Sequence, residues 1–96
     1  MKTEKALQSY LFRKCEKAGI YCRKMSSPGR RGFPDVLLKR WGFNTLLVEV
    51  KTPAGTGVLS ALQVREIALL REHGMQVEVI SSKEEVDAII SYLTGR

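Results

Sequence analysis

The sequence predicts an α/β fold in which helices flank a mixed β-sheet, with the element order α-β-β-β-α-β-α. Three segments repeat apolar residues at helical spacing between a capping residue and a glycine. Four short segments are rich in β-branched and apolar residues, as strands are. A chain of 96 residues with 44% hydrophobic residues can form one core, so we expect a single domain over residues 1–96.

The first helix is expected over residues 4–18. Thr3 can cap its first turn, and Gly19 can end it. Its apolar face consists of Leu7, Tyr10, Leu11, Cys15 and Ala18. A short extended stretch should follow over residues 20–25. The segment 26–34 is rich in Gly, Pro and Ser, which is typical of a loop.

The next two strands are expected over residues 35–40 and 45–51. The WGFN segment between them has the composition of a turn, so the two strands should form a hairpin. Residues 52–57, TPAGTG, interrupt the regular structure again.

The remaining residues predict a helix, a strand and a last helix. Ser60 and Gln63 form an S-x-x-Q capping box, which indicates a helix from there to His73. Residues 76–80 alternate as a strand, and a second capping box opens the last helix at Ser82. The apolar face of that helix consists of Val86, Ile89, Ile90 and Leu93. The connection through the middle helix should be a right-handed βαβ unit.

Positive charge is concentrated in the first half of the chain. Residues 1–51 carry twelve Lys and Arg against four Asp and Glu, whereas residues 52–96 carry four against six. Such a basic half suggests a polyanionic partner, nucleic acid before an anionic membrane. No apolar run reaches the roughly 18 residues of a membrane span, and the N-terminal segment lacks the apolar stretch of a secretory signal. We therefore expect an intracellular (cytoplasmic) protein that does not bind membranes.

Cysteine and histidine exclude several kinds of site. Cys15 and Cys22 match no zinc or redox spacing, so they are expected to be small buried hydrophobic residues in a reducing compartment. His73 is the one histidine, which excludes a His-rich metal cluster and disfavours a Ser-His-Asp triad.

Three ionisable residues occupy positions that packing alone does not explain. Asp35 starts a strand directly after Pro34, and Glu49 and Lys51 lie inside an apolar run. Because strand side chains alternate, Glu49 and Lys51 point to one face, where burial of charge has a high desolvation cost. The hairpin would bring Asp35 beside them.

This cluster favours a metal-assisted reaction on phosphate. Two carboxylates are suitable oxygen ligands for Mg²⁺ or Mn²⁺, which can bind phosphate and lower the pKa of a bound water. Lys51 could orient that water, accept its proton or stabilise charge on phosphorus. The alternative is that Glu49 and Lys51 form a structural ion pair on an edge strand.

The residues resemble a known family at this point. Pro34-Asp35 followed by Glu49-Val50-Lys51 is similar to the PD-(D/E)XK nuclease motif. The early helix with Glu4 and Gln8, the segments RRGFPDVLL and VEVKTPAG, and the later SALQ with GMQVEVI resemble the VRR-Nuc family over nearly the whole chain. The resemblance implies a restriction-endonuclease-like αβββαβ core with an extra C-terminal helix. It also implies a Mg²⁺- or Mn²⁺-dependent phosphodiesterase acting on DNA, with no organic cofactor.

The same resemblance assigns site residues. It implies that Asp35, Glu49 and the Val50 carbonyl bind the metal and that Lys51 is catalytic. Glu4 resembles the family's helix-borne acid and is a further candidate metal ligand. It shares a stripe with Leu7 and Leu11 and is expected to face inward, although an exposed acid at a helix N-terminus is the alternative. Gln63 resembles the family's late glutamine near the catalytic site, or it serves only the helix cap. Gln8 is a weaker candidate.

Basic and aromatic residues extend the predicted site. The candidates for holding phosphate lie around the loop that leads into the acidic cluster, and the alternative is a solvated charged loop. They are Arg23, Lys24, Arg30 and Arg31. Trp41 and Phe43 have three open uses: stacking on an unpaired base, contact with a second subunit, or cover for the core.

We expect an endonuclease that is selective for DNA structure, because the chain shows no helix typical of base readout. Branched DNA such as a Holliday junction is the expected substrate, and a stand-alone homodimer, as the resemblance suggests, would present two sites to two strands. Size and resemblance suggest a phage or mobile element. The main alternative is a DNA-binding module that does not cleave and partners another enzyme. A restriction- or transposition-type nuclease ranks lower, because it would need a base-reading surface that the sequence does not show. An RNA substrate is a further alternative, since nothing in the sequence distinguishes DNA from RNA.

Overall fold

A computed structural model describes residues 3–25, 32–51 and 58–95 of the chain. The predicted order of helices and strands is confirmed. The elements are α1 (Glu4–Ala18), β1 (Tyr21–Lys24), β2 (Val36–Lys39), β3 (Leu46–Val50), α2 (Ala61–Glu72), β4 (Gln76–Ile80) and α3 (Lys83–Thr94). None of the helices in these ranges is long and apolar enough to cross a membrane.

The four strands form one mixed sheet in the order β1-β2-β3-β4. β1 and β2 are antiparallel, as are β2 and β3, whereas β3 and β4 are parallel and are connected through α2. β3 is therefore an inner strand with a partner on each side, and all five of its residues are buried.

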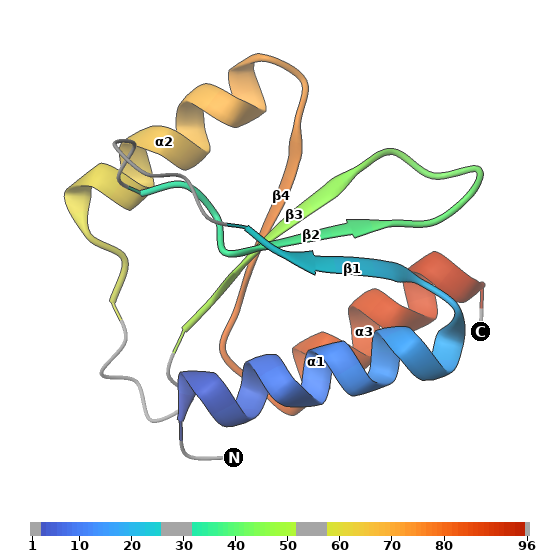
Figure 1. The fold of residues 1–96 in the computed structure, drawn as a ribbon. Helices are drawn as coiled ribbons and strands as arrows, with labels where there is room; N and C mark the ends of the chain where they lie inside the picture. Colours follow the sequence, from blue (N-terminus) through green and yellow to red (C-terminus); the bar gives the residue numbers. More distant parts are fainter. Residues whose placement is uncertain (1–2, 26–31, 52–57, 96) are drawn as a thin grey trace.

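Helices cover the two faces of this sheet unequally. α1 and α3 lie together along one face, and α2 lies on the other, near β3 and β4 (Figure 1). The larger core lies under α1 and α3 and includes Leu7, Leu11, Cys15, Val36, Leu38, Val48 and Val86. The smaller core lies under α2 and is centred on Leu47, Ile67 and Val77.

Local signals explain the helix ends. The Thr3 hydroxyl accepts a hydrogen bond from the Ala6 amide at 3.0 Å, and Gly19 ends α1 with φ of 73°. Ser60 and Gln63 form both halves of the predicted capping box at the start of α2. Each cap satisfies backbone groups that the first or last helical turn leaves without a partner.

The strands β2 and β3 are shorter than predicted at the end where they carry the acidic residues. Asp35 and Lys51 lie one residue outside them, although their backbones stay attached to the sheet. The Asp35 carbonyl accepts from the Met25 amide at 2.6 Å, and the Lys51 amide donates to the Ile80 carbonyl at 2.8 Å. The sheet therefore holds both residues while their side chains lie at its end.

Gly32, before β2, lies directly against the first turn of α2. Its φ is +85°, and a Cβ atom placed on it would lie 2.6 Å from the carbonyl oxygen of Leu62. Only glycine fits this position without strain. The chain entering β2 is therefore held against the first turn of α2.

Candidate active site

The register of the β2–β3 hairpin brings Asp35 and Glu49 together. Val36 pairs with Val48 and Leu37 with Leu47, so the next pair outward is Asp35 opposite Glu49. Directly opposed residues on one sheet face have Cβ atoms about 4.5–5.5 Å apart. The two carboxylates therefore meet at the end of the sheet.

Glu49 is buried in a polar environment that is only partly satisfied. The residue is 2% exposed. Its Oε2 accepts a hydrogen bond from Gln63 Nε2 at 3.1 Å and lies 3.5 Å from Lys51 Nζ. Its Oε1 is buried and has no hydrogen-bond partner within the described residues. A buried carboxylate oxygen of this kind is costly unless a positive group completes its coordination.

Burial shifts the protonation of both carboxyl groups. Burial, reinforced by the nearby Asp35 carboxylate, raises the pKa of Glu49 to about 7, although Lys51 acts in the opposite direction. Burial also raises the pKa of Asp35; Glu49 and Lys51 oppose the rise, and Glu4 adds to it. Two carboxyl groups that resist ionisation side by side are typical of a functional site.

Lys51 forms the predicted ion pair with Glu49, and the ammonium group is nearly buried, since its side chain is 13% exposed. The alternative considered from the sequence was a purely structural ion pair on an edge strand. The pair exists, but it belongs to an inner strand, because β3 is flanked by β2 and β4. An edge-strand ion pair therefore does not describe it.

Gln63 has both of the roles that the sequence left as alternatives. Its Oε1 accepts from the Ser60 amide at 2.9 Å, which completes the cap of α2. Its Nε2 donates to Glu49 at 3.1 Å. Since one amide group makes both bonds, the start of α2 fixes the position of a carboxylate on β3.

A groove of about 390 Å³ opens beside Asp35. It lies between α1 and the adjoining ends of the sheet strands. The residues that line it are Glu4, Lys5, Gln8, Ser9, Lys24, Asp35 and Val50. The groove is therefore bordered by cations and by hydrogen-bonding side chains, a combination that can hold phosphate oxygens.

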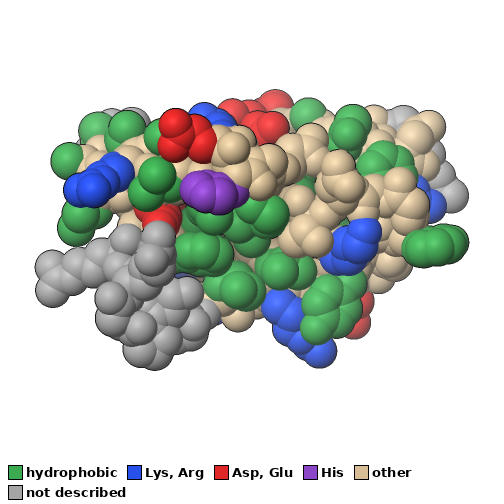
Figure 2. Space-filling model, turned by 90° about the horizontal axis from the view of Figure 1, so that it is seen from above, with side chains coloured by type: hydrophobic (Ala, Val, Ile, Leu, Met, Phe, Trp, Pro, Cys, Tyr) green, Lys and Arg blue, Asp and Glu red, His purple; other side chains and the backbone are tan. Residues whose placement is uncertain are grey.

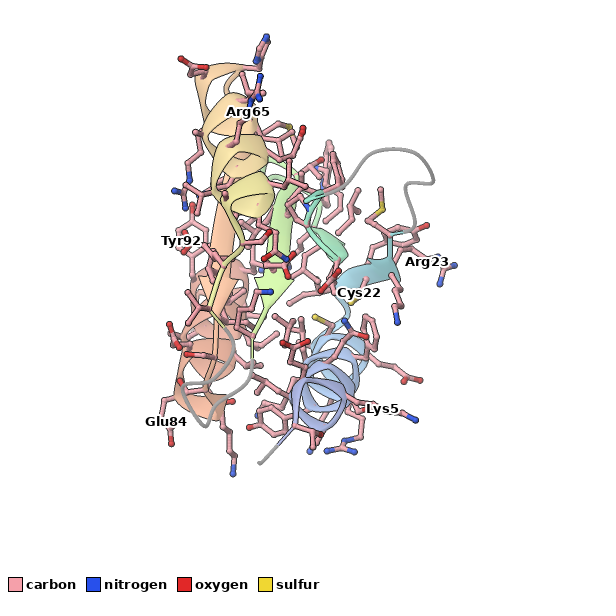
Figure 3. The ribbon with its side chains drawn as sticks, turned by 90° about the vertical axis from the view of Figure 1, so that its left-hand side faces the viewer. Lys5, Cys22, Arg23, Arg65, Glu84 and Tyr92 are labelled. Atoms are coloured by element: carbon pink, nitrogen blue, oxygen red, sulfur yellow. The ribbon has the colours of Figure 1, made fainter. Side chains whose placement is uncertain are left out.

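Two residues of this groove, Lys5 and Ser9, were not predicted from the sequence. They lie on α1 at the same spacing as Glu4 and Gln8, so a polar stripe along the start of that helix was the signal that could have found them. Lys5 projects from α1 toward the same side of the molecule as Arg23 of β1 (Figure 3).

Glu4 does not face inward as predicted. It is exposed, unlike Leu7 and Leu11 on the same stripe, because the first turn of α1 borders the groove and not the core. Its charge still reaches the site, where it contributes to the raised pKa of Asp35.

Within the described ranges, no three Asp, Glu, His or Cys side chains lie close enough together to bind one metal ion.

The predicted phosphate-binding residues divide into two groups. Lys24 lines the groove beside Asp35, and Arg23 is exposed on β1. Arg30 and Arg31 lie outside the described residues.

Cys15 is buried and Cys22 is half-buried, and both are free thiols.

The donor set fits a hard divalent cation. Asp35 and Glu49 supply two adjacent carboxylates, and the buried Glu49 Oε1 has no donor among the described residues to satisfy it. Oxygen ligands of this kind suit Mg²⁺ and Mn²⁺, and a cation would favour the ionised form of both groups. A cation held by these carboxylates would therefore place positive charge beside a phosphate in the groove that Asp35 lines.

Comparison with known proteins identifies the family of this chain. A family model described as the VRR-NUC domain matches residues 2–84. A relative from Acyrthosiphon pisum secondary endosymbiont phage 1, named "Putative nuclease p44", is 35% identical over 81 residues, which are 84% of this chain and 85% of the relative. A solved structure described as a VRR_NUC domain is 33% identical with a TM-score of 0.83, covering 96% of this chain and 98% of that chain. The chain therefore belongs to the VRR-NUC family of nuclease domains.

Proposed function

We propose that this chain is a Mg²⁺- or Mn²⁺-dependent endonuclease that hydrolyses phosphodiester bonds in branched DNA. The observation that carries the proposal is the buried Glu49 carboxylate, which has Asp35, Lys51 and Gln63 around it, together with the open groove that Asp35 lines. A fold alone would not require this cluster, because its desolvation cost lowers stability.

Each residue of the cluster has a role in this proposal. Asp35, Glu49 and the Val50 carbonyl are the candidate ligands of the cation. When bound, the cation would polarise the phosphate and make water a stronger acid. Lys51 is placed to orient the attacking water, to take its proton or to stabilise charge on the phosphate oxygens. Gln63 keeps the Glu49 carboxylate in place through its hydrogen bond.

The surroundings of the site support selectivity for DNA structure over base sequence. The groove offers charge and small polar groups, which contact the DNA backbone and carry no base-specific pattern. A twofold homodimer would present two such sites, one to each strand of a four-way junction. Both substrate shape and dimerisation are parts of the proposal.

A DNA-binding module that does not cleave is the second candidate. The basic half of the chain favours it. The buried carboxylate pair disfavours it, because two acids beside a phosphate-binding groove reduce affinity for phosphate unless a cation intervenes.

The test uses end-labelled four-way junction, linear duplex and single-stranded DNA. Each is incubated with the protein in Mg²⁺, in Mn²⁺ and in chelator, with Lys51→Ala as the inactive variant and Lys83→Ala, on α3, as the matched control. We expect paired cuts in the junction that need metal and Lys51. Junction that is bound but uncut in every metal condition would support the binding module, and a protein that light scattering shows to be monomeric at micromolar concentration would contradict the dimer.

A further inference from the structure

Among the described residues, no helix covers β1 and the outer end of β2 on the sheet face that carries α2 (Figure 1). α2 packs on Leu47 of β3 and Val77 of β4 through Ile67, and Leu37 of β2 is partly buried against this cluster. Because strand side chains alternate and Cys22, Val36 and Leu38 face the opposite core, their neighbours face this open side. These neighbours are Tyr21, Arg23, Leu37 and Lys39.

The residues of this face form a strip that begins at the active site; Tyr21, Arg23 and Lys39 are exposed, and Asp35 and Leu37 are half-buried. β1 and β2 pair Arg23 with Leu37 and Tyr21 with Lys39, and Asp35 precedes Leu37 by two residues on the same side. At about 3.3 Å per residue, the strip from Asp35 to Lys39 is about 13 Å long, which is enough to contact more than one nucleotide of an unpaired strand.

Within this strip, Arg23 and Tyr21 form a composite surface. The guanidinium carbon lies 4.9 Å from the centre of the Tyr21 ring, and Arg23 Nε donates to the Tyr21 hydroxyl at 3.1 Å. Tyr21 nevertheless remains 54% exposed. An aromatic ring backed by a guanidinium offers a flat face for a base and a positive charge for its phosphate.

The turn beyond β2 presents a second aromatic ring. Phe43 packs on the core, with its ring 5.6 Å from that of Tyr92, so this residue is core cover. Arg40 donates to the Leu93 carbonyl, and Lys39 donates to the Phe43 carbonyl. These bonds fix the turn, yet Trp41 within it is 95% exposed. The fold therefore holds an indole outward without using it for packing.

Glu16 of α1 lines the same hollow as Tyr21 and Arg23, but cations outnumber acids along the strip, and this charge favours a polyanion as its occupant. No Asp or Glu occurs between Glu16 and Asp35, or between Asp35 and Glu49. Basic side chains lie beside hydrophobic ones on the right-hand half of the face that Figure 2 shows. A second copy of the chain would have to bury these cations without acidic partners from the same segments, which is unfavourable.

We propose that Tyr21, Arg23, Lys39 and Trp41, here called the β1–β2 strip, bind an unpaired segment of DNA that leaves the active site. Bases stack on the Trp41 and Tyr21 rings, while Arg23 and Lys39 contact phosphates. This inference rests on the proposed function, because it takes DNA as the substrate. It adds a reason for selectivity: branched DNA offers unpaired bases, and continuous duplex does not.

Trp41 is the single tryptophan of the chain, so intrinsic fluorescence reports on the strip directly. The wild-type protein is titrated in chelator, which prevents cleavage, with a duplex carrying a single-stranded dT tail and with the same duplex blunt-ended. We expect saturable quenching with the tailed DNA and little change with the blunt duplex. Equal quenching by both, or none by either at concentrations where gel shift shows binding, would overturn the proposal.

Variants separate stacking from charge. Trp41→Ala should raise the dissociation constant for tailed DNA about tenfold, and Trp41→Phe should restore most of the affinity. Neither substitution should change the melting temperature, since the indole is not packed. Lys39→Ala should weaken binding and lower its salt dependence, unlike Lys83→Ala on α3. Trp41→Ala that binds and cleaves like wild type would refute the strip.

The outcome also separates this inference from the proposed function. Quenching by tailed DNA without cleavage of any substrate would retain the strip and refute the endonuclease. Cleavage that is unaffected by Trp41→Ala would do the reverse. A blue shift of Trp41 emission when protein alone is concentrated would identify a second copy as the occupant and would contradict the proposal.

Discussion

Replacing Glu49 by Gln should stabilise the metal-free protein at alkaline pH. Burial and the Asp35 carboxylate raise the pKa of Glu49 from 4.5 to about 7. A raised pKa means that the folded protein binds the proton more tightly than the unfolded chain, so stability is lost as the pH rises from about 4.5 through 7. At 1.36 kcal/mol per pKa unit, the loss is about 3 kcal/mol, with little solvent screening because the side chain is 3% exposed.

The assay is urea denaturation of wild type and Glu49→Gln in chelator at several values between pH 5 and pH 8.5. The difference in unfolding free energy should shift by about 3 kcal/mol in favour of the variant over this range. Glu78→Gln, an exposed position on β4, is the matched control and should run parallel to wild type. Excess Mn²⁺ should restore stability to wild type at pH 8.5 and not to Glu49→Gln. Parallel curves for wild type and Glu49→Gln in chelator would refute the reasoning.

Three further predictions test the site and its support. Lys51→Ala should lower single-turnover cleavage by a factor of about 10²–10⁴ while DNA binding in gel shift is retained; equal loss of both would contradict a catalytic role. Gln63→Ala and Ser60→Ala should each lower the unfolding free energy by about 1 kcal/mol, because both remove a bond of the same helix cap. Only Gln63→Ala should also lower kcat. A lower kcat in both variants would mean that the cap alone matters. Gly32→Ala should lower the unfolding free energy by about 1–3 kcal/mol in thermal melts, more than Gly42→Ala, which has a similar φ but open space around it.

Local chemistry explains why the elements were predictable. Thr3, Ser60 and Ser82 each accept the hydrogen bond that caps a helix, and Gly19 and Gly95 end two helices with positive φ. These signals depend on residues within one turn of each other, so they can be seen in the sequence. The meeting of Asp35 and Glu49 was predictable for a similar reason, because hairpin register follows from the strands and the turn that joins them.

The parts of the site that depend on helix docking were not predictable. The polar stripe at the start of α1 marks Lys5 and Ser9, but they line the groove because α1 lies across the end of the sheet, and that docking is not encoded locally. The exposure of Glu4 has the same origin. Phe43 is packed and Trp41 is exposed because Phe43 contacts Tyr92 in α3, a residue that is distant in the sequence and close in the fold.

The central claim is that Asp35 and Glu49 together form a divalent-cation site. Calorimetric titration of the full chain with Mn²⁺ at pH 8, where the raised pKa of Glu49 permits ionisation, tests it most directly. We predict one saturable site per chain in wild type, lost or weakened at least tenfold in Asp35→Asn and in Glu49→Gln and unchanged in Glu78→Gln. Wild-type and Asp35→Asn proteins that bind Mn²⁺ with equal affinity would contradict the account.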